Sequence, residues 1–198
     1  MVLGVTGGIG SGKSFVAKEF CSFPNTAYYH ADEEAKKLMN TSPEIKKQLI
    51  NEFGSKSYEN NELNKAYISS IVFKDPSQLS KLNSIVHPIV KRHFQEYVSL
   101  QKKDTIIVYE NAILFEINSD QFCDFIITVT APINERIKRV VERDNITAEA
   151  VLERIKNQWT DEKKSMLSNY TINNLNKDKT LLKIKKIYNF LTKNQGLF

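Results

Sequence analysis

The residues most suggestive of chemistry are glycines that lead into a lysine and a serine. Five of the seven glycines lie within the first twelve residues, and the last of these five stands directly before Lys13 and Ser14. Segment 7–14, GGIGSGKS, matches the phosphate-binding pattern G-x-x-x-x-G-K-[ST]. Glycines let a strand-to-helix turn adopt positive φ and bring several backbone N–H groups close to one anion. The segment predicts a loop that binds the phosphates of a nucleoside triphosphate.

Two side chains of this loop have a predicted chemical role. Lys13 is expected to reach the β- and γ-phosphates, and the Ser14 hydroxyl is expected to ligate Mg²⁺. A ligand-free glycine-rich turn is disfavoured, because an apolar run at 2–5 precedes the motif and a helical pattern at 15–20 follows it. The residues expected around the nucleotide phosphates are Gly8, Ile9, Gly10, Ser11, Gly12, Lys13, Ser14 and Phe15.

Strands and helices alternate along the chain and would position this loop. A helical block occupies most of 42–103, with His87-Pro88 marking an expected boundary before its last helix, and a closing helix is expected at 177–193. The predicted fold class is α/β, a P-loop NTPase-type doubly wound parallel sheet with an inserted helical subdomain and a helical lid. Runs of apolar and aromatic residues predict its strands at 2–5, 27–30, 105–109, 125–129 and 170–172.

One domain is expected over residues 1–198. Its nucleotide-binding core would comprise 1–30 and 104–198, and the inserted helical block would comprise 31–103. An arginine-rich stretch places the lid at about 136–165. Arg139 and Arg143 are four residues apart and so share one helix face, a spacing that suits two guanidinium groups clamping phosphates, although a solvent-facing position is the common one for helical arginines.

The amino-acid composition indicates which kinds of partner and which cellular compartment to expect. Lysine and arginine number 28 against 23 acidic residues, a net charge of +5 that suits polyanionic ligands. No tight basic run with interleaved aromatics suggests a nucleic-acid partner, and no apolar run reaches the roughly 20 residues of a membrane span. The two cysteines, Cys21 and Cys123, form no C-x-x-C motif. We therefore expect a protein of the reducing cytoplasm, without nucleic-acid or membrane partners.

The loop alone leaves motors, GTPases and small-molecule kinases as candidate classes. GTPases usually carry D-x-x-G and N-K-x-D, and neither pattern occurs here. A motor ATPase would have an apolar strand ending in Asp-Glu, whereas the run at 105–108 is followed by Tyr109-Glu110. The residues favour a small-molecule kinase, with nucleoside monophosphates among the possible acceptors.

Several segments in order along the chain resemble the dephospho-CoA kinase family, and together they span about 170 residues. The opening VTGGIGSGKS at 5–14 is nearly a signature of that family. Further similarities are Ala31-Asp32 to D-A-D, LNSIVHP at 82–88 to L-N-x-x-x-H-P, LFE at 114–116 to P-L-L-F-E, RVVERD at 139–144 to R-x-x-x-R-D, 154–158 to the lid helix, and Asn174 to the asparagine of V-I-x-N. The resemblance implies transfer of a phosphoryl group from ATP to the ribose 3′-hydroxyl of dephospho-CoA, with Mg²⁺ as cofactor.

The resemblance also implies residue roles. Asp32 would bind the acceptor and take the proton of its hydroxyl, although an aspartate there can also simply cap the next helix. Arg139 would act in catalysis, and Arg143 and Asn174 would contact the nucleotide. His87 would contact the acceptor substrate, and a structural histidine at a helix junction is an equally good interpretation.

Three positions depart from the family pattern. They are His30 for the first aspartate of D-A-D, Ala112 for the proline of P-L-L-F-E, and Asn169 for a common aspartate. The first departure could weaken contacts to metal or ribose, whereas the other two would affect local backbone geometry. Oligomeric state is left open.

Overall fold

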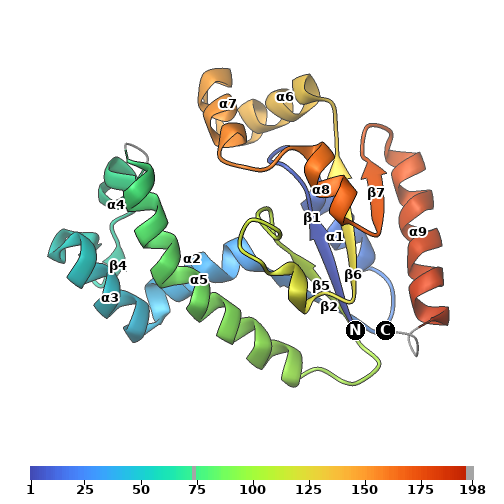
Figure 1. The fold of residues 1–198 in the computed structure, drawn as a ribbon, viewed down its shortest axis with the longest axis horizontal. Coiled ribbons are helices and arrows are strands. Elements are labelled where there is room, and N and C mark those ends of the chain that lie inside the picture. Colours follow the sequence, from blue (N-terminus) through green and yellow to red (C-terminus); the bar gives the residue numbers. More distant parts are fainter. Residues whose placement is uncertain (73–74, 195–198) are drawn as a thin grey trace. The chain divides into compact units, whose positions relative to one another are not determined.

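The computed structural model describes residues 1–72 and 75–194, and a parallel sheet organises much of this part of the chain (Figure 1). The strands lie in the order β2-β5-β1-β6-β7, and each neighbouring pair is parallel. The predicted α/β fold is confirmed, and each predicted strand is present with ends within one residue of those expected. The strands are β1 (Val2–Thr6), β2 (Thr26–His30), β5 (Ile106–Glu110), β6 (Phe125–Thr130) and β7 (Tyr170–Asn173).

Helices cover both faces of the sheet, which explains why β1 and β5 are buried along their whole length. On one face, Ile127 and Val129 pack in a core with α1 (Lys13–Phe20) and α9 (Lys177–Lys193). Thr128 between them faces the opposite way, and its hydroxyl lies 2.5 Å from that of Ser168, directly after α8 (Asp161–Leu167). Figure 1 accordingly shows α8 in front of the sheet and α1 behind it.

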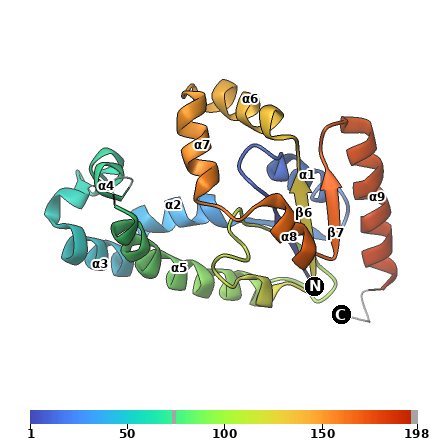
Figure 2. The same ribbon diagram turned by 45° about the horizontal axis from the view of Figure 1, so that its top comes forward.

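Two further helices follow the carboxyl end of β6. They are α6 (Ile133–Asp144) and α7 (Ala148–Lys156), and the arrowhead of β6 points towards α6 in both views (Figure 2). Ligands of open α/β sheets bind outside the carboxyl ends of the strands. The arginine-rich segment therefore lies at the functional edge of this sheet.

The chain divides into two compact units, one of residues 1–30 and 101–198 and the other of residues 31–100. The second unit has its own apolar core, which includes Ile45, Leu49, Val86 and Val90. Its helices are α2 (Ala31–Thr41), α3 (Pro43–Phe53), α4 (Lys65–Val72) and α5 (Pro76–Ser99), and short 3₁₀ turns occupy Ser55–Ser57 and, in the first unit, Asp120–Phe122.

A small hairpin interrupts the block that was expected to be almost wholly helical, so that expectation was wrong here. β3 (Tyr58–Glu59) pairs antiparallel with β4 (Glu62–Leu63). The two residues between them, Asn60 and Asn61, have φ of 49° and 70°. Asparagine tolerates this left-handed region, which two-residue hairpin turns require at both central positions.

The expected helix boundary at His87-Pro88 was also wrong, because α5 continues through Pro88. An internal proline removes one helical hydrogen bond and costs roughly 3 kcal/mol. Buried Val86 and Phe94 lie on either side of Pro88 and belong to the same helix. Burying apolar side chains on both sides of the proline offsets the lost hydrogen bond.

No helix of the described residues is long and apolar enough to cross a membrane.

Candidate active site

The glycine-rich segment forms the turn between β1 and α1. Gly10 and Gly12 have φ of 79° and 89°, a region that favours glycine, and Gly12 caps the amino end of α1. The N–H groups at the start of a helix lack intrahelical acceptors, and the helix dipole adds partial positive charge there. Lys13, Ser14 and Phe15 form the first turn of α1, so their N–H groups stand at this anion-binding position.

A buried carboxylate lies against the hydroxyl that the motif assigns to Mg²⁺. Glu110 ends β5, is fully buried, and pairs in register with Val5 of β1 just before the loop. Ser14 Oγ donates to Glu110 Oε1 at 2.6 Å, and the Tyr28 hydroxyl donates to Oε2. His30 Nε2 lies 3.5 Å from Oε1. The departure at position 30 thus puts an imidazole beside a carboxylate.

Sequence reasoning missed Glu110. It was considered only as a failed match to a motor-type Asp-Glu ending, and it was not assigned a role. The available signal was its position at the end of an apolar strand in a parallel sheet. Such a strand brings its last residue to the same edge as the phosphate loop.

Ser14 and Glu110 together provide the oxygen donors that Mg²⁺ prefers, a hydroxyl and a carboxylate. Their contact of 2.6 Å shows that both oxygens reach one point beside the loop. Among the described residues, no group of three or more His, Cys, Asp or Glu side chains could by itself hold a metal ion.

Arg139, expected to act in catalysis, and Asn174, expected to contact the nucleotide, both lie against the outer side of the loop. Arg139 Nη1 lies 3.4 Å from the carbonyl oxygens of Gly10 and of Ser11, and its Nη2 donates to Asn174 O at 2.9 Å. Asn174 Nδ2 donates to Ser11 O at 3.0 Å. The structure therefore brings these two predicted residues to the loop.

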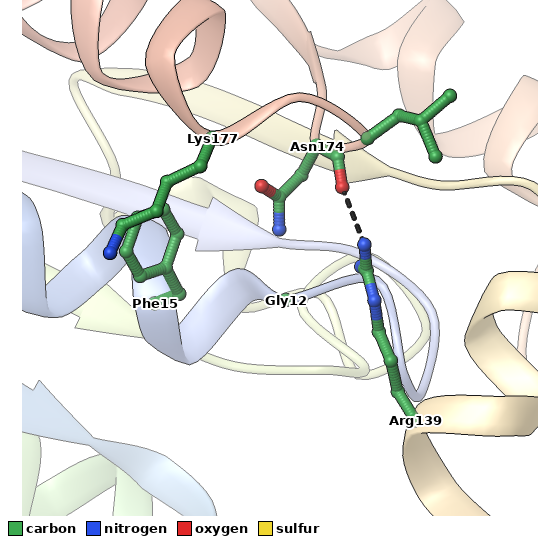
Figure 3. Close-up of a pocket in the computed structure, with 6 residues that line it drawn as sticks. Gly12, Phe15, Arg139, Asn174 and Lys177 are labelled. Carbon is green, nitrogen blue, oxygen red and sulfur yellow. Dashed lines mark hydrogen bonds between the residues drawn. The ribbon is translucent and has the colours of Figure 1, made fainter.

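A pocket of about 330 Å³ opens beside these residues (Figure 3). The figure shows Lys177 passing beside the Phe15 ring, and the lysine Nζ lies 5.7 Å from the ring centroid. The size falls within the usual range for small-molecule sites, and the wall offers apolar, amide and cationic groups. Such a wall suits a planar ring with hydrogen-bonding edges. The pocket is lined by Gly12, Phe15, Arg139, Asn174, Leu175 and Lys177.

Arg143 lies elsewhere on α6. Its guanidinium group is largely exposed and donates to the neighbouring Asp144 at 2.7 and 3.0 Å. Arg154 of α7 donates to the same carboxylate at 2.9 Å. This ion-paired cluster holds α6 to α7, so the structure does not bring Arg143 to the loop, and its contact with a nucleotide stays a prediction.

Asp32 and His87 belong to the second unit. Asp32 is exposed in the first turn of α2, and His87 is half-buried on α5. Burial lowers the pKa of His87, and the negative charge of Asp32 opposes that shift. The charge of Asp32 thus acts on His87, and the role of either residue at an acceptor site stays a prediction.

The other two departures from the family pattern preserve backbone contacts. Ala112 O accepts a hydrogen bond of 2.5 Å from Lys164 Nζ, a contact that needs only the carbonyl group. Asn169 Oδ1 accepts from Ile126 N at 2.8 Å and so fixes the start of β6. An aspartate at position 169 would offer the same acceptor oxygen.

The parallel sheet, with a glycine-rich loop after its central strand and a carboxylate on the neighbouring strand, defines a P-loop kinase fold. Solved structures of other proteins show the same fold. A Thermus thermophilus protein, TT1252, is 28% identical with a TM-score of 0.83, and the match covers 96% of this chain and 97% of that chain. The dephospho-CoA kinase of Campylobacter jejuni, 20% identical with a TM-score of 0.63 and 97% coverage of both chains, shares the fold.

The family model described as dephospho-CoA kinase matches residues 1–179. The dephospho-CoA kinase of Bacteroides fragilis is 35% identical over 189 residues, which cover 96% of this chain and 92% of that relative. The dephospho-CoA kinase of Fusobacterium nucleatum is 32% identical over 94% of this chain and 96% of its own. The chain belongs to the dephospho-CoA kinase family, and the resemblance seen in the sequence is confirmed.

Proposed function

We propose that the protein transfers the γ-phosphoryl group of ATP to the ribose 3′-hydroxyl of dephospho-CoA, giving CoA and ADP in the last step of coenzyme A synthesis. The family match over residues 1–179 carries this proposal. Phosphoryl transfer depends on in-line positioning and charge neutralisation more than on covalent chemistry. The loop at the start of α1 fits that need.

ATP would bind with its phosphates at the loop and its base in the pocket beside Phe15. The N–H groups of the first turn of α1 would bind the phosphate oxygens, and Lys13 would reach the β- and γ-phosphates. Asn174 and Arg139, which line the pocket, would contact the nucleotide. Arg139 would also support catalysis by binding the Gly10 and Ser11 carbonyls and so holding the loop in place.

Mg²⁺ would be held by Ser14 and, directly or through water, by Glu110. The short contact between their oxygens and the full burial of Glu110 support this assignment. When bound, Mg²⁺ neutralises charge on the β- and γ-phosphate oxygens. Tyr28 donates to the far oxygen of Glu110 and so orients the carboxylate towards Ser14.

Dephospho-CoA would bind the unit of residues 31–100. Asp32 would orient the ribose hydroxyl and accept its proton, a task that a carboxylate within hydrogen-bond reach can perform. His87 would hold the acceptor as a neutral imidazole, because burial lowers its pKa. The charge interaction between these two residues supports a shared site.

The segment of about 136–165 would act as the lid over the nucleotide. Its two helices α6 and α7 follow the carboxyl end of β6, where ligands of such sheets bind. We further propose that the protein works in the cytoplasm without nucleic-acid or membrane partners. Cys21 and Cys123 are both free thiols, as expected in a reducing compartment.

A coupled ADP-release assay tests the proposal. The wild-type protein is given ATP and Mg²⁺ with dephospho-CoA, with each nucleoside monophosphate, or with short single-stranded nucleic acid. We expect turnover with dephospho-CoA and none above background with the others. Lys13→Ala serves as the inactive control, because it removes the fixed charge that would stabilise the phosphates during transfer. Faster turnover with a nucleoside monophosphate would overturn the acceptor assignment.

A further inference from the structure

Three consecutive carbonyl groups of the phosphate loop, those of residues 9–11, accept hydrogen bonds from side chains outside the loop. Arg136 Nε donates to the first carbonyl at 2.9 Å. Arg139 Nη1 lies 3.4 Å from the second and from the third, and Asn174 Nδ2 is 3.0 Å from the third. The outer surface of the loop is thus held by two guanidinium groups and an amide.

These contacts determine where the loop N–H groups point. In a trans peptide the C=O group and the next N–H group point in opposite directions. Fixing the carbonyls of residues 9–11 outwards therefore directs the N–H groups of residues 10–12 to the other side. The Ser11 N–H group is used within the loop, since it donates to Gly8 O at 3.1 Å. Those of Gly10 and Gly12 are aimed where an anion would lie.

Ile9 is held at both of its backbone groups. Its N–H donates to Gln158 Oε1 at 2.8 Å, whereas its carbonyl accepts from Arg136. Gln158 lies just after α7, and Arg136 lies on α6. The two residues that hold Ile9 therefore come from two separate parts of the expected lid.

A buried ion pair holds Arg136, one of the two residues that bind the Ile9 backbone. Arg136 is 6% exposed, and its Nη1 donates at 3.1 Å to Asp161 Oδ2 at the start of α8. Burial raises the pKa of Asp161, and the charge of Arg136 opposes that rise. Hydrogen bonds in such a low-dielectric setting are strong and well oriented. The ion pair with Asp161 therefore fixes the orientation of the guanidinium group that donates to Ile9 O.

We propose that Gln158 and Arg136 are positioning residues that set the direction of the Ile9 peptide groups and thereby aim the loop N–H groups at the β- and γ-phosphates. Neither residue needs to touch ATP for this role. The proposal rests on the proposed use of ATP and extends it, because it makes phosphate affinity depend on the segment after α7. The hydrogen bond from Ile9 N–H to Gln158 can be removed by mutation without leaving a buried charge unpaired, whereas loss of Arg136 would leave Asp161 unpaired.

Gln158→Leu tests the proposal, because leucine has similar bulk and cannot accept the Ile9 hydrogen bond. We expect the Kd of ATP to rise about 3- to 10-fold, the usual worth of one hydrogen bond. The Kd of AMP, which lacks the β- and γ-phosphates, should stay within about twofold. The KM for ATP should rise with little change in the KM for dephospho-CoA. Amide exchange at Ile9 should become faster.

Two further variants complete the test. Gln158→Asn keeps the amide but is one methylene shorter, so it should reproduce the loss specific to ATP if leucine harms folding. Gln121→Leu is the matched control in the same unit, since Gln121 is exposed and its amide donates to Asn118 O. This control should bind ATP and AMP like the wild-type protein.

The results separate the alternatives. Equal weakening of ATP and AMP, or unchanged binding of both, would overturn the positioning role. Tighter ATP binding would also overturn it, because Gln158 would then be competing with phosphate for the Ile9 N–H group. Failure of the wild-type protein to bind ATP would instead overturn the proposed function.

Discussion

Glu110 and Asp32 are the two carboxylates to which the proposed function gives separate tasks. Glu110 is fully buried and accepts hydrogen bonds from Ser14 and Tyr28. Asp32 is exposed in the first turn of α2. A buried, hydrogen-bonded carboxylate suits a fixed position at a metal, whereas an exposed one can meet an incoming hydroxyl group. Variants at the two positions should therefore fail in different ways.

Asp32→Asn should lower kcat by about 10²–10⁴-fold, the usual worth of general-base assistance, with little change in the Kd for ATP. Asparagine keeps the size and the capping ability of aspartate but is a far weaker proton acceptor. Single-turnover rates with saturating dephospho-CoA measure the effect. If Asp32 only stabilises the start of α2, the variant will turn over within about threefold of the wild-type rate.

Glu110→Gln should raise the Mg²⁺ concentration for half-maximal activity by about 10- to 100-fold, because the variant loses the charge that holds or orients the cation. Activity is titrated with Mg²⁺ at saturating ATP, beside a thermal melt. Glu19→Gln on α1 is the control and should leave the Mg²⁺ titration unchanged. An unchanged titration in Glu110→Gln would show that this carboxylate has no part in holding Mg²⁺.

At the scale of elements, α8 is anchored by a buried cation. Lys164 is fully buried, donates to Ala112 O, and pairs with Glu116 Oε1 at 2.8 Å. Glu116 Oε1 also accepts from the Trp159 N–H at 2.9 Å. These contacts hold the turn before α8 against the segment after β5. They therefore also hold Asp161, the first residue of α8, where its carboxylate meets Arg136.

The second unit contains one helix with an unfavourable residue, Pro88 in the interior of α5. Pro88→Ala should stabilise the protein by about 1–3 kcal/mol, because it restores a backbone N–H donor and removes the clash with the preceding turn. Urea unfolding followed by circular dichroism measures the change. Pro76→Ala, in the first turn of the same helix where proline is well tolerated, should change stability by less than about 1 kcal/mol. Equal effects at both positions would contradict this account.

At the scale of the molecule, each unit has an apolar core of its own. The core of the first unit lies between the sheet and helices α1 and α9, and that of the second lies among its helices. Units with separate cores can be ordered separately by ligands, since each opens locally with its own free energy. This independence makes the two proposed binding regions distinguishable in solution.

Hydrogen exchange with each ligand alone should therefore give different protection patterns. Dephospho-CoA should slow exchange within residues 31–100, and ATP should slow it in the loop and in residues 136–165. The reason is that an amide exchanges more slowly where a ligand orders the backbone. Peptide-level mass spectrometry measures both patterns. Unchanged exchange in both regions at saturating ligand would show that both sites are rigid before binding.

Most of the fold could be predicted because its signals are local. Each strand of the main sheet is a short apolar run, and the phosphate loop is one contiguous motif whose glycines adopt the expected backbone. The exceptions arose where packing or turn geometry outweighed a local rule. Pro88 lies inside α5 because apolar burial continues on both sides of it, and the hairpin at 58–63 depends on two asparagines with positive φ.

The sequence by itself determined the fold class, the family and the position of the phosphate loop, because these depend on residues adjacent in the chain. Only the tertiary structure decided which side chains surround that loop. Gln158 and Ile9 are 149 residues apart, and Glu110 and Ser14 are 96 apart. Contacts over such separations depend on strand order and helix packing, which side-chain spacing along the chain does not encode. The same reason applies to Arg139, which meets the loop carbonyl of Gly10 across 129 residues.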